Sequence, residues 1–197
     1  LGPIFEKIFA PLIEAGFIQF AYGGGDVGAY LTRHNLVDTI HITGSARTHD
    51  AIVFGVGEEG EQHKRENQSI MNKPISSELG GVSPTIVVPG PWSKGDFKFQ
   101  AENIATQKLQ NAGHNCIATQ VLIMPKEWVG TKKLLQEVEN KIANTESRPA
   151  YYPGAADRQN AAREHANAKS LNCDVDRTII YDVDVLIDEP CFTDEYF

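Results

Sequence analysis

The stretch TIHITGSARTHDAIVF, residues 39–54, decides the fold class. Residues 39–43 have the side chains typical of a strand, and residues 45–54 predict a helix. A Gly-Ser turn joins the two elements. A strand that passes through a tight turn into a helix is the unit from which parallel α/β sheets are built.

The residues before this stretch continue the same alternation. FIQFAY, residues 17–22, predicts another strand, and residues 27–34 predict a short helix. Residues 3–15 have apolar side chains at helical spacing, although Pro11 removes one helical hydrogen bond. Helix, strand, helix, strand, helix is the order typical of an α/β fold with parallel strands.

A polar and highly charged segment, residues 55–72, interrupts the alternation and predicts a surface loop. A separate α/β unit is expected after it. We predict strands at 74–79, 85–88, 120–124, 178–181 and 183–187, and helices at 95–112, 127–143 and 155–169. On the 127–143 helix, Trp128, Leu135, Val138 and Ile142 share one face. We assign residues 1–76 to the first domain and residues 77–197 to the second.

Charge and composition exclude several classes of function. The formal net charge is −8, and phosphate binding needs a basic face, so we expect no nucleic-acid partner. No apolar run approaches the ~20 residues of a membrane helix and no signal peptide is visible, so we expect a cytoplasmic protein that contacts no membrane. The three cysteines and six histidines show neither a disulfide framework nor metal-ligand spacing, so we expect no metal. Because the chain begins at Leu1 and stops at Phe197, we expect both ends to be cuts through a longer protein.

Two glycine-containing turns are candidate anion sites. The residues from Gly23 to Gly28 contain G-x-G-x-x-G between a predicted strand and a helix, which suits a dinucleotide-binding turn. The acidic residue expected ~20 positions later is absent from the end of the next strand, so a turn without a ligand stays open. At the second turn, Gly44 and Ser45 place amides and a hydroxyl at the positive end of a helix. Ser45 can equally be an N-cap serine.

Two further residues are candidates for chemistry. Glu78 lies at a predicted strand end before two glycines, where a carboxylate can act as a general base. The alternative is an exposed glutamate without a role. Cys116 lies at a predicted helix–strand junction, where a thiolate can act as a nucleophile. The alternative is a small buried apolar residue.

Three of these motifs together resemble the NAD(P)-dependent aldehyde dehydrogenase superfamily. Its members have Thr-Gly-Ser at a strand end, then Glu-Leu-Gly-Gly-x-Ser-Pro, then Asn-x-Gly-Gln-x-Cys. Here the motifs are Thr43–Ser45, Glu78–Pro84 and Asn111–Cys116, and the second matches at every position. The third departs once, with His114 in place of glutamine, and the 38 positions from Glu78 to Cys116 are slightly more than usual. The last residues, 195–197, resemble the start of the family's Glu-x-Phe-Gly-Pro motif.

The resemblance implies an aldehyde-dehydrogenase-like α/β fold that is incomplete at both ends. Residues 1–76 would be the C-terminal part of the dinucleotide-binding domain, and residues 77–197 a truncated catalytic domain. The resemblance also implies a small-molecule aldehyde as substrate, NAD or NADP as cofactor, and a homodimer or homotetramer. The family's oxyanion-stabilising asparagine lies upstream of these motifs, and losing such a donor costs ~10²–10³ in rate, so we expect the 197-residue chain by itself to be inactive.

The resemblance assigns roles to individual residues. In this family a cysteine attacks the aldehyde and a glutamate activates the water that hydrolyses the thioester, which implies Cys116 as nucleophile and Glu78 as general base. It further implies cofactor contacts by Gly44 and Ser45 at the pyrophosphate, Leu79 at the nicotinamide, Glu195 at the ribose hydroxyls and Phe197 close by. The turn at 23–28 loses importance, because the family does not hold its dinucleotide in that way.

Three other functions stay open at this point. A dehydrogenase that passes the acyl group to coenzyme A resembles this family, but such members usually lack the glutamate found here as Glu78. A thiol esterase would use Cys116 with a histidine and no cofactor. A non-enzymatic α/β protein that merely keeps the fold is the third, and the intact pair of Glu78 and Cys116 argues against it.

Overall fold

The structure is a computed structural model of the chain that describes residues 1–171, 177–184, 186 and 190–195. It separates into two compact units, Leu1–Leu79 and Gly80–Phe197. Each unit contains a pair of parallel strands together with helices. The α/β class with parallel strands, which the sequence predicts, is therefore confirmed.

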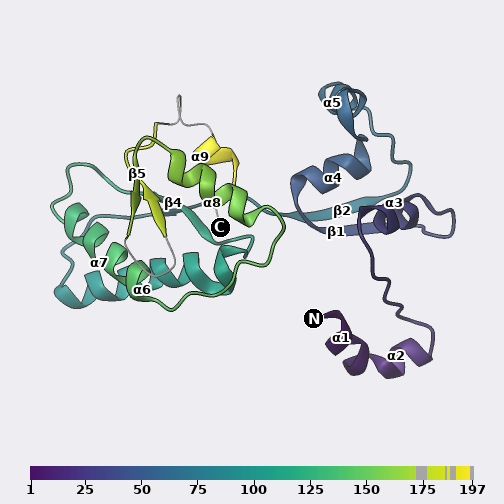
Figure 1. Ribbon diagram of the computed structural model, residues 1–197, viewed down its shortest axis with the longest axis horizontal. Coiled ribbons are helices and arrows are strands. Elements are labelled where there is room, and N and C mark those ends of the chain that lie inside the picture. The colour runs from purple at the N-terminus through teal and green to yellow at the C-terminus, as the bar shows by residue number, and fades with distance from the viewer. Residues whose placement is uncertain (172–176, 185, 187–189, 196–197) are drawn as a thin grey trace. The chain divides into compact units, whose positions relative to one another are not determined.

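The first unit is built around one βα connection (Figure 1). Its helices are α1 (Gly2–Ile8), α2 (Ala10–Glu14), α3 (Gly25–Arg33), α4 (Ala46–Val53) and α5 (Gly57–Arg65), and its strands are β1 (Ile40–Gly44) and β2 (Ile75–Leu79). The strands are parallel, with Ile40 beside Ile75 and Gly44 beside Leu79. Helix α4 follows β1 after Ser45, whose side chain accepts a hydrogen bond from the Thr48 amide at 3.1 Å. The predicted strand and helix of residues 39–54 are thus both present.

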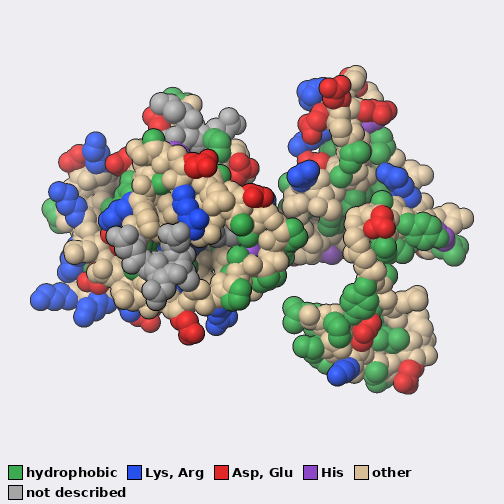
Figure 2. Space-filling model, in the orientation of Figure 1, with side chains coloured by type: hydrophobic (Ala, Val, Ile, Leu, Met, Phe, Trp, Pro, Cys, Tyr) green, Lys and Arg blue, Asp and Glu red, His purple; other side chains and the backbone are tan. Residues whose placement is uncertain are grey.

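The segment before β1 differs from the prediction in two places. The helix predicted over 3–15 is divided at Phe9 into α1 and α2, because Pro11 has no amide hydrogen and fits only the first turn of a helix. The strand predicted at 17–22 is wrong, since these residues pair with no strand in the fully described first unit. Their aromatic residues favour a strand locally, but a strand also needs a neighbour for its backbone hydrogen bonds. Apolar side chains remain exposed along α1 and α2 (Figure 2).

The loop predicted over 55–72 is wrong for residues 57–65, which form α5. The charges that suggested a loop are arranged to suit a helix. Glu58 and Glu59 lie in the first turn and basic residues lie in the last, so both ends complement the helix dipole. Lys64 also donates to the Asp50 carboxylate on α4 at 2.7 Å, which joins the two helices and lowers the pKa of Asp50.

The second unit carries most of the buried side chains. Its elements are β3 (Ser83–Ile86), α6 (Lys94–Leu109), the 3-10 helix η1 (Gln110–Gly113), β4 (Thr119–Ile123), α7 (Thr131–Asn144), α8 (Ala155–Glu164), β5 (Ala168–Ser170), β6 (Thr178–Ile180) and α9 (Pro190–Thr193). Strands β3 and β4 are parallel and are connected through α6, whereas β5 and β6 are antiparallel. None of the helices in the described part of the chain combines the length and the hydropathy that crossing a bilayer requires.

The core of this unit lies between β3, β4 and the neighbouring helices α6 and α7 (Figure 1). Its buried members are Val87, Phe97, Ala101, Ile104, Leu134 and Val138, and Trp92 and Trp128 pack against them. The prediction placed Leu135 on the inner face of α7, but it is Leu134 that is 0% exposed. Helix α7 begins at Thr131, four residues later than predicted, and Trp128 packs on Phe97 from the preceding turn. A capping box at Ser93 and Asp96 starts α6.

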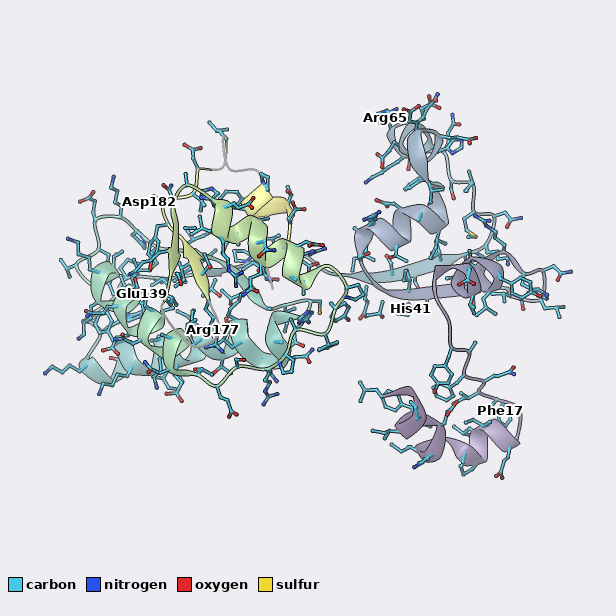
Figure 3. All side chains as sticks on the ribbon, in the orientation of Figure 1. Phe17, His41, Arg65, Glu139, Arg177 and Asp182 are labelled. Carbon is cyan, nitrogen blue, oxygen red and sulfur yellow. The ribbon has the colours of Figure 1, made fainter. Side chains whose placement is uncertain are left out.

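The hairpin of β5 and β6 is anchored to α7 by side chains (Figure 3). The Glu139 carboxylate accepts hydrogen bonds from Tyr181 and, at 2.8 Å, from Lys169. Burial and the Glu139 contact raise the pKa of Tyr181. Arg177 donates to carbonyl groups at the end of α7, including Thr145 at 2.7 Å. These contacts stabilise the hairpin on a helix that is distant in sequence.

The last predicted elements agree only in part. The helix predicted over 155–169 ends at Glu164, and residues 168–170 form β5 instead. The strand predicted at 178–181 is present as β6. Of the strand predicted at 183–187, the described residues 183, 184 and 186 are not in a strand, and the others lie outside the described residues.

Replacing Leu134 by alanine tests the position of this core. We expect the variant to lose ~2–5 kcal/mol of unfolding free energy, because it leaves a cavity where a fully buried side chain was. The measurement is urea unfolding followed by tryptophan fluorescence, since Trp92 and Trp128 both contact this core and are the two tryptophans of the chain. Leu135→Ala is the matched control, because Leu135 is only partly buried. An equal loss in the two variants would contradict the observed packing.

Candidate active site

The parallel pairing of β1 and β2 aligns two of the predicted motifs at their carboxyl ends. Thr43 is the register partner of Glu78, and Gly44 is the register partner of Leu79. Ligands of open α/β sheets bind outside the carboxyl ends of the strands. The predicted cofactor turn and the predicted base therefore lie at one edge of the same strand pair, and Glu78 is exposed there.

The turn after β1 leaves open space and backbone amides at the start of α4. A Cβ atom at Gly44 would approach only the Ile42 side chain, at 3.8 Å or more, so the space beside this residue is open. The first bonds within α4 are those from the Thr48 and His49 amides to the Ser45 carbonyl. The amides of Ala46 and Arg47 precede these bonds and point beyond the helix end, where an anion is favoured. Both interpretations of Ser45 are compatible, because an N-cap serine leaves these amides available.

Cys116 is exposed in a turn immediately before β4. Cys191, in contrast, is 9% exposed, and Cys173 lies outside the described residues. The backbone carbonyl of Cys116 accepts a long hydrogen bond, 3.4 Å, from the Ser83 hydroxyl at the start of β3. A nucleophilic thiol must be accessible to its substrate, and Cys116 meets this condition whereas Cys191 does not.

The loop that leads to Cys116 has an unusual backbone. Asn111 and Ala112 have φ of 54°, and Gly113 follows at 81°, so three consecutive residues are left-handed. For a non-glycine residue this conformation costs roughly 1–2 kcal/mol. Such strain persists only where surrounding contacts impose it, and it is concentrated at functional sites.

Side chains hold this loop from two directions. The Tyr151 hydroxyl donates to the Asn111 side-chain oxygen at 3.1 Å, and the Asn111 amide group donates to Asn115, also at 3.1 Å. His114 stacks with Tyr151 and Tyr152, with ring centroids 4.9 and 4.7 Å apart. The one departure from the family motif, His114, is therefore part of an aromatic stack that supports the loop. Sequence reasoning did not find this stack, because no local pattern connects His114 to tyrosines almost forty positions later.

A cluster of polar side chains forms hydrogen bonds at the first residue of β4. Thr119 is buried, and its hydroxyl lies 2.8 Å from that of Thr85 and donates to Gln107 on α6 at 2.7 Å. These bonds satisfy a buried polar group and connect β3, β4 and α6 three residues after Cys116.

Glu195 lies against the glycine that follows Leu79. A Cβ atom at Gly80 would be 2.5 Å from one Glu195 carboxylate oxygen and 2.8 Å from the other, so a larger residue here would displace the Glu195 carboxylate. Arg158 on α8 donates to the Glu195 carbonyl at 2.8 Å, and its guanidinium is 3.7 Å from the carboxylate. Glu195, which is predicted to bind the ribose, thus lies beside Gly80 within the second unit. Sequence reasoning did not identify Arg158, which lies in an ordinary helix far from any motif.

Lys108 introduces a second cation near this carboxylate. Its ammonium group donates to the Gln120 side chain at 2.9 Å. Burial lowers the pKa of Lys108 to about 8, and the Glu195 charge partly opposes this shift. A basic residue in this position balances the negative charge of Glu195.

The other predicted site residues are placed as follows. Glu78 and Leu79 belong to the first unit and Cys116 to the second. Phe197 lies outside the described residues. In the turn at 23–28, a Cβ atom at Gly23 would be 2.2 Å from the Val27 side chain, and α3 starts at Gly25, so the glycine at position 23 has a packing role in the turn.

Comparisons with known proteins identify the family to which the chain is similar. The family model described as "Aldehyde dehydrogenase family" matches residues 3–169. The chain is 25% identical to a lactaldehyde dehydrogenase of Methanococcus maripaludis over 178 residues, which are 85% of this chain and 34% of that protein. It is 28% identical to the D-glyceraldehyde dehydrogenase (NADP(+)) of Thermoplasma acidophilum over 142 residues, 71% of this chain and 26% of the relative. The chain thus spans about a quarter to a third of the length of these curated relatives.

The fold is also that of solved structures. The NADP-dependent glyceraldehyde-3-phosphate dehydrogenase of Bacillus halodurans, solved in complex with NADP, superposes with a TM-score of 0.63 at 21% sequence identity. The superposition covers 90% of this chain and 38% of that structure. At this level of identity the likeness establishes the fold.

Proposed function

Because the chain belongs to the aldehyde dehydrogenase family, we propose that the whole protein oxidises an aldehyde to a free carboxylic acid with NAD⁺ or NADP⁺. The observation that carries the proposal is the register of β1 and β2, which places Gly44 beside Leu79 and Thr43 beside Glu78. In this proposal the carboxyl end of β1 binds the cofactor, and the carboxyl end of β2 carries the base, Glu78. In this proposal residues 1–76 belong to the dinucleotide-binding domain and residues 77–197 to the catalytic domain.

The cofactor contacts in the proposal follow from the strand ends. Gly44, Ser45 and the first amides of α4 hold the pyrophosphate, for which the open space and the helix end are suited. Leu79 packs on the nicotinamide. Glu195 holds the hydroxyl groups of the adjoining ribose through its carboxylate, and Phe197 packs close by. When bound, the dinucleotide supplies an acceptor for a hydride.

In the first half-reaction, the Cys116 thiolate attacks the aldehyde carbon. A carbon–sulfur bond forms, and the carbonyl electron pair moves to oxygen. When the carbonyl re-forms, the hydrogen on that carbon leaves with its electron pair, and a thioester on Cys116 remains. Sulfur suits this task because it is both a good nucleophile and a good leaving group. The exposed turn and the supported left-handed loop present Cys116 to the substrate.

In the second half-reaction, Glu78 removes a proton from water as the water oxygen attacks the thioester carbon. The tetrahedral intermediate then expels the Cys116 thiolate and releases the acid. Water is a weak nucleophile at neutral pH, so this step depends on the base.

The proposal is tested by identifying the product. The whole protein is incubated with lactaldehyde, glyceraldehyde or an aminoaldehyde, which are substrates named for its relatives, together with NAD⁺ or NADP⁺. We expect reduced nicotinamide and an equal amount of free acid, and we expect coenzyme A to leave the product unchanged. Acyl-coenzyme A as the product would instead establish the acylating reaction. Ester cleavage with no cofactor reduction from any aldehyde would establish a thiol esterase. We further propose that the whole protein is cytoplasmic and forms a homodimer or homotetramer. Size-exclusion chromatography with light scattering would test the state of assembly.

A further inference from the structure

The Glu195 side chain lies in a mostly enclosed position beside Gly80. It is 19% exposed, and its two carboxylate oxygens would be 2.5 and 2.8 Å from a Cβ atom at Gly80. Gly80 directly follows Leu79, the proposed contact of the nicotinamide. In the proposed function the Glu195 carboxylate binds the ribose attached to that ring, so the position of this carboxylate affects how tightly the cofactor binds.

Arg158 contacts Glu195 at two points. Its Nη1 atom donates to the Glu195 backbone carbonyl at 2.8 Å and lies 3.7 Å from the carboxylate oxygen Oε2. The first contact is a charge-assisted hydrogen bond, which is stronger than a neutral one and restrains the backbone. The second is longer than a hydrogen bond, so Nη1 attracts the carboxylate without using one of its acceptor sites. The carboxylate can then accept hydrogen bonds from hydroxyl groups such as those of a ribose.

The position of Arg158 in α8 directs its side chain inward. Arg158 lies three residues after Ala155 and four before Ala162, and both alanines are buried, so the three residues share the packed face of the helix. The Arg158 amide bonds to the Gly154 carbonyl at 3.1 Å. An arginine on a packed face has fewer rotamers available than one on the surface, so less freedom is lost when it binds Glu195.

Lys108 on α6 is a second cation near Glu195, but its contact is of a different kind. Burial lowers the pKa of Lys108 to about 8, and the Glu195 charge partly opposes this shift. Lys108 donates to the Gln120 side chain at 2.9 Å, whereas Arg158 donates to the Glu195 backbone. Lys108 therefore adds to the positive potential around Glu195, and Arg158 also restrains the place from which the carboxylate extends.

We propose that Arg158 is a positioning residue that holds Glu195 where its carboxylate binds the ribose hydroxyls of the cofactor. The inference rests on the proposed function, in which Glu195 is the ribose ligand. Arg158 acts through Glu195 and not on the carbon that reacts at Cys116. Its loss should therefore weaken cofactor binding and leave the rate of the chemical steps nearly unchanged.

The test measures cofactor affinity and turnover separately in the whole protein. Arg158→Met keeps most of the side-chain length but removes the charge and the hydrogen bond. We expect the Kd and KM of NAD⁺ or NADP⁺ to rise about tenfold, the loss typical of a hydrogen bond to a charged group. We expect kcat to change less than about twofold, because binding and not the chemical step is affected. Titration calorimetry gives the Kd, and steady-state nicotinamide reduction gives KM and kcat.

Two further variants of arginines in α8 control for a general effect on the helix. Arg163→Met is the matched control, because Arg163 is in the same helix but donates to Asn160 at 3.1 Å, and it should keep the parent Kd. Arg158→Lys keeps a cation and a donor, so its Kd should lie between those of the parent and Arg158→Met. A Kd in Arg158→Lys no better than that in Arg158→Met would contradict a role of the charge.

A double-mutant cycle determines whether Arg158 acts through Glu195. Glu195→Ala removes the carboxylate and should itself raise the Kd of the cofactor. Once the carboxylate is absent, its position no longer matters, so adding Arg158→Met to Glu195→Ala should raise the Kd no further. An equal rise with and without the Glu195 side chain would show that Arg158 acts independently, and it would overturn the inference.

Other outcomes separate a failure of this inference from a failure of the proposed function. If Glu195→Ala weakens cofactor binding while Arg158→Met binds as the parent does, the ribose contact stands and only the role of Arg158 is wrong. A fall in kcat as large as the rise in KM would also contradict a positioning role. If Glu195→Ala binds the cofactor as tightly as the parent, the ribose contact and the inference both fail. A parent protein that reduces neither NAD⁺ nor NADP⁺ would contradict the proposed function, and the inference with it.

Discussion

Cys116→Ala is expected to remove aldehyde oxidation by the whole protein, with kcat/KM falling by ~10⁴-fold or more. The loss is large because the thiol forms the covalent bond on which both half-reactions depend, and no other group replaces it. Its exposed position before β4 makes the same thiol accessible to reagents. Steady-state kinetics of nicotinamide reduction measure the effect. Alkylation by iodoacetamide, followed by peptide mass spectrometry, should modify Cys116 in parallel with the loss of activity.

Cys191→Ala is the matched control for this variant. Cys191 is buried in α9, so its replacement removes a thiol that substrate does not reach, and we expect activity close to that of the parent. Circular dichroism of both variants shows whether the fold is retained. If a folded Cys116→Ala protein kept more than about a hundredth of the parent activity, the nucleophile would have to be another residue.

Glu78→Gln is expected to stop turnover after one cycle. Glutamine keeps the size of the side chain and a hydrogen-bonding oxygen but cannot accept a proton at neutral pH, so hydrolysis of the thioester should slow by ~10²–10⁴-fold. The first half-reaction needs no base at this position. Rapid mixing with aldehyde and cofactor should therefore show a burst of reduced nicotinamide equal to the enzyme concentration, followed by a slow phase. Mass spectrometry of the stalled protein should find the acyl group on Cys116.

Glu102→Gln is the corresponding control. Glu102 is exposed on α6 and forms a surface ion pair with Lys141 at 2.9 Å, a kind of contact that contributes roughly 0–1 kcal/mol to stability. Its variant should turn over at the parent rate. A Glu78→Gln protein that hydrolyses its acyl enzyme at the parent rate would show that another group activates the water.

Local sequence patterns predicted the structure correctly where all residues of one segment favour the same elements. Residues 39–54 form a strand, a turn and a helix as predicted, because the branched residues, the Gly-Ser turn and the capping serine all favour the same structure. Local patterns gave a wrong prediction where a contact with another segment determines the secondary structure. Residues 17–22 have the composition of a strand but no strand beside them, and residues 57–65 look like a loop but form a helix that Lys64 ties to Asp50.

The candidate site divides in the same way. Glu78 and Cys116 could be selected as candidates because their motifs, read together, resemble those of a known family, and a carboxylate and a thiol suit the roles that the resemblance implies. The contacts that support these two residues and Glu195 could not be predicted from the sequence. Tyr151 lies forty positions from Asn111, and Arg158 lies thirty-seven positions from Glu195, yet each pair is joined by a hydrogen bond. No sequence period connects residues at such separations.

From the sequence alone follow the parallel α/β class, the strand, turn and helix of residues 39–54, and the candidate residues for the chemistry. Each of these depends on side chains within a few positions of one another, whose spacing is set by the geometry of a helix or strand. Only the tertiary structure decided that Thr43 stands beside Glu78, that His41 bonds to Ser76, and that Glu195 approaches Gly80. These contacts depend on strand register and on packing between distant segments, which are determined by the energy of the whole fold and not by any one stretch of the chain.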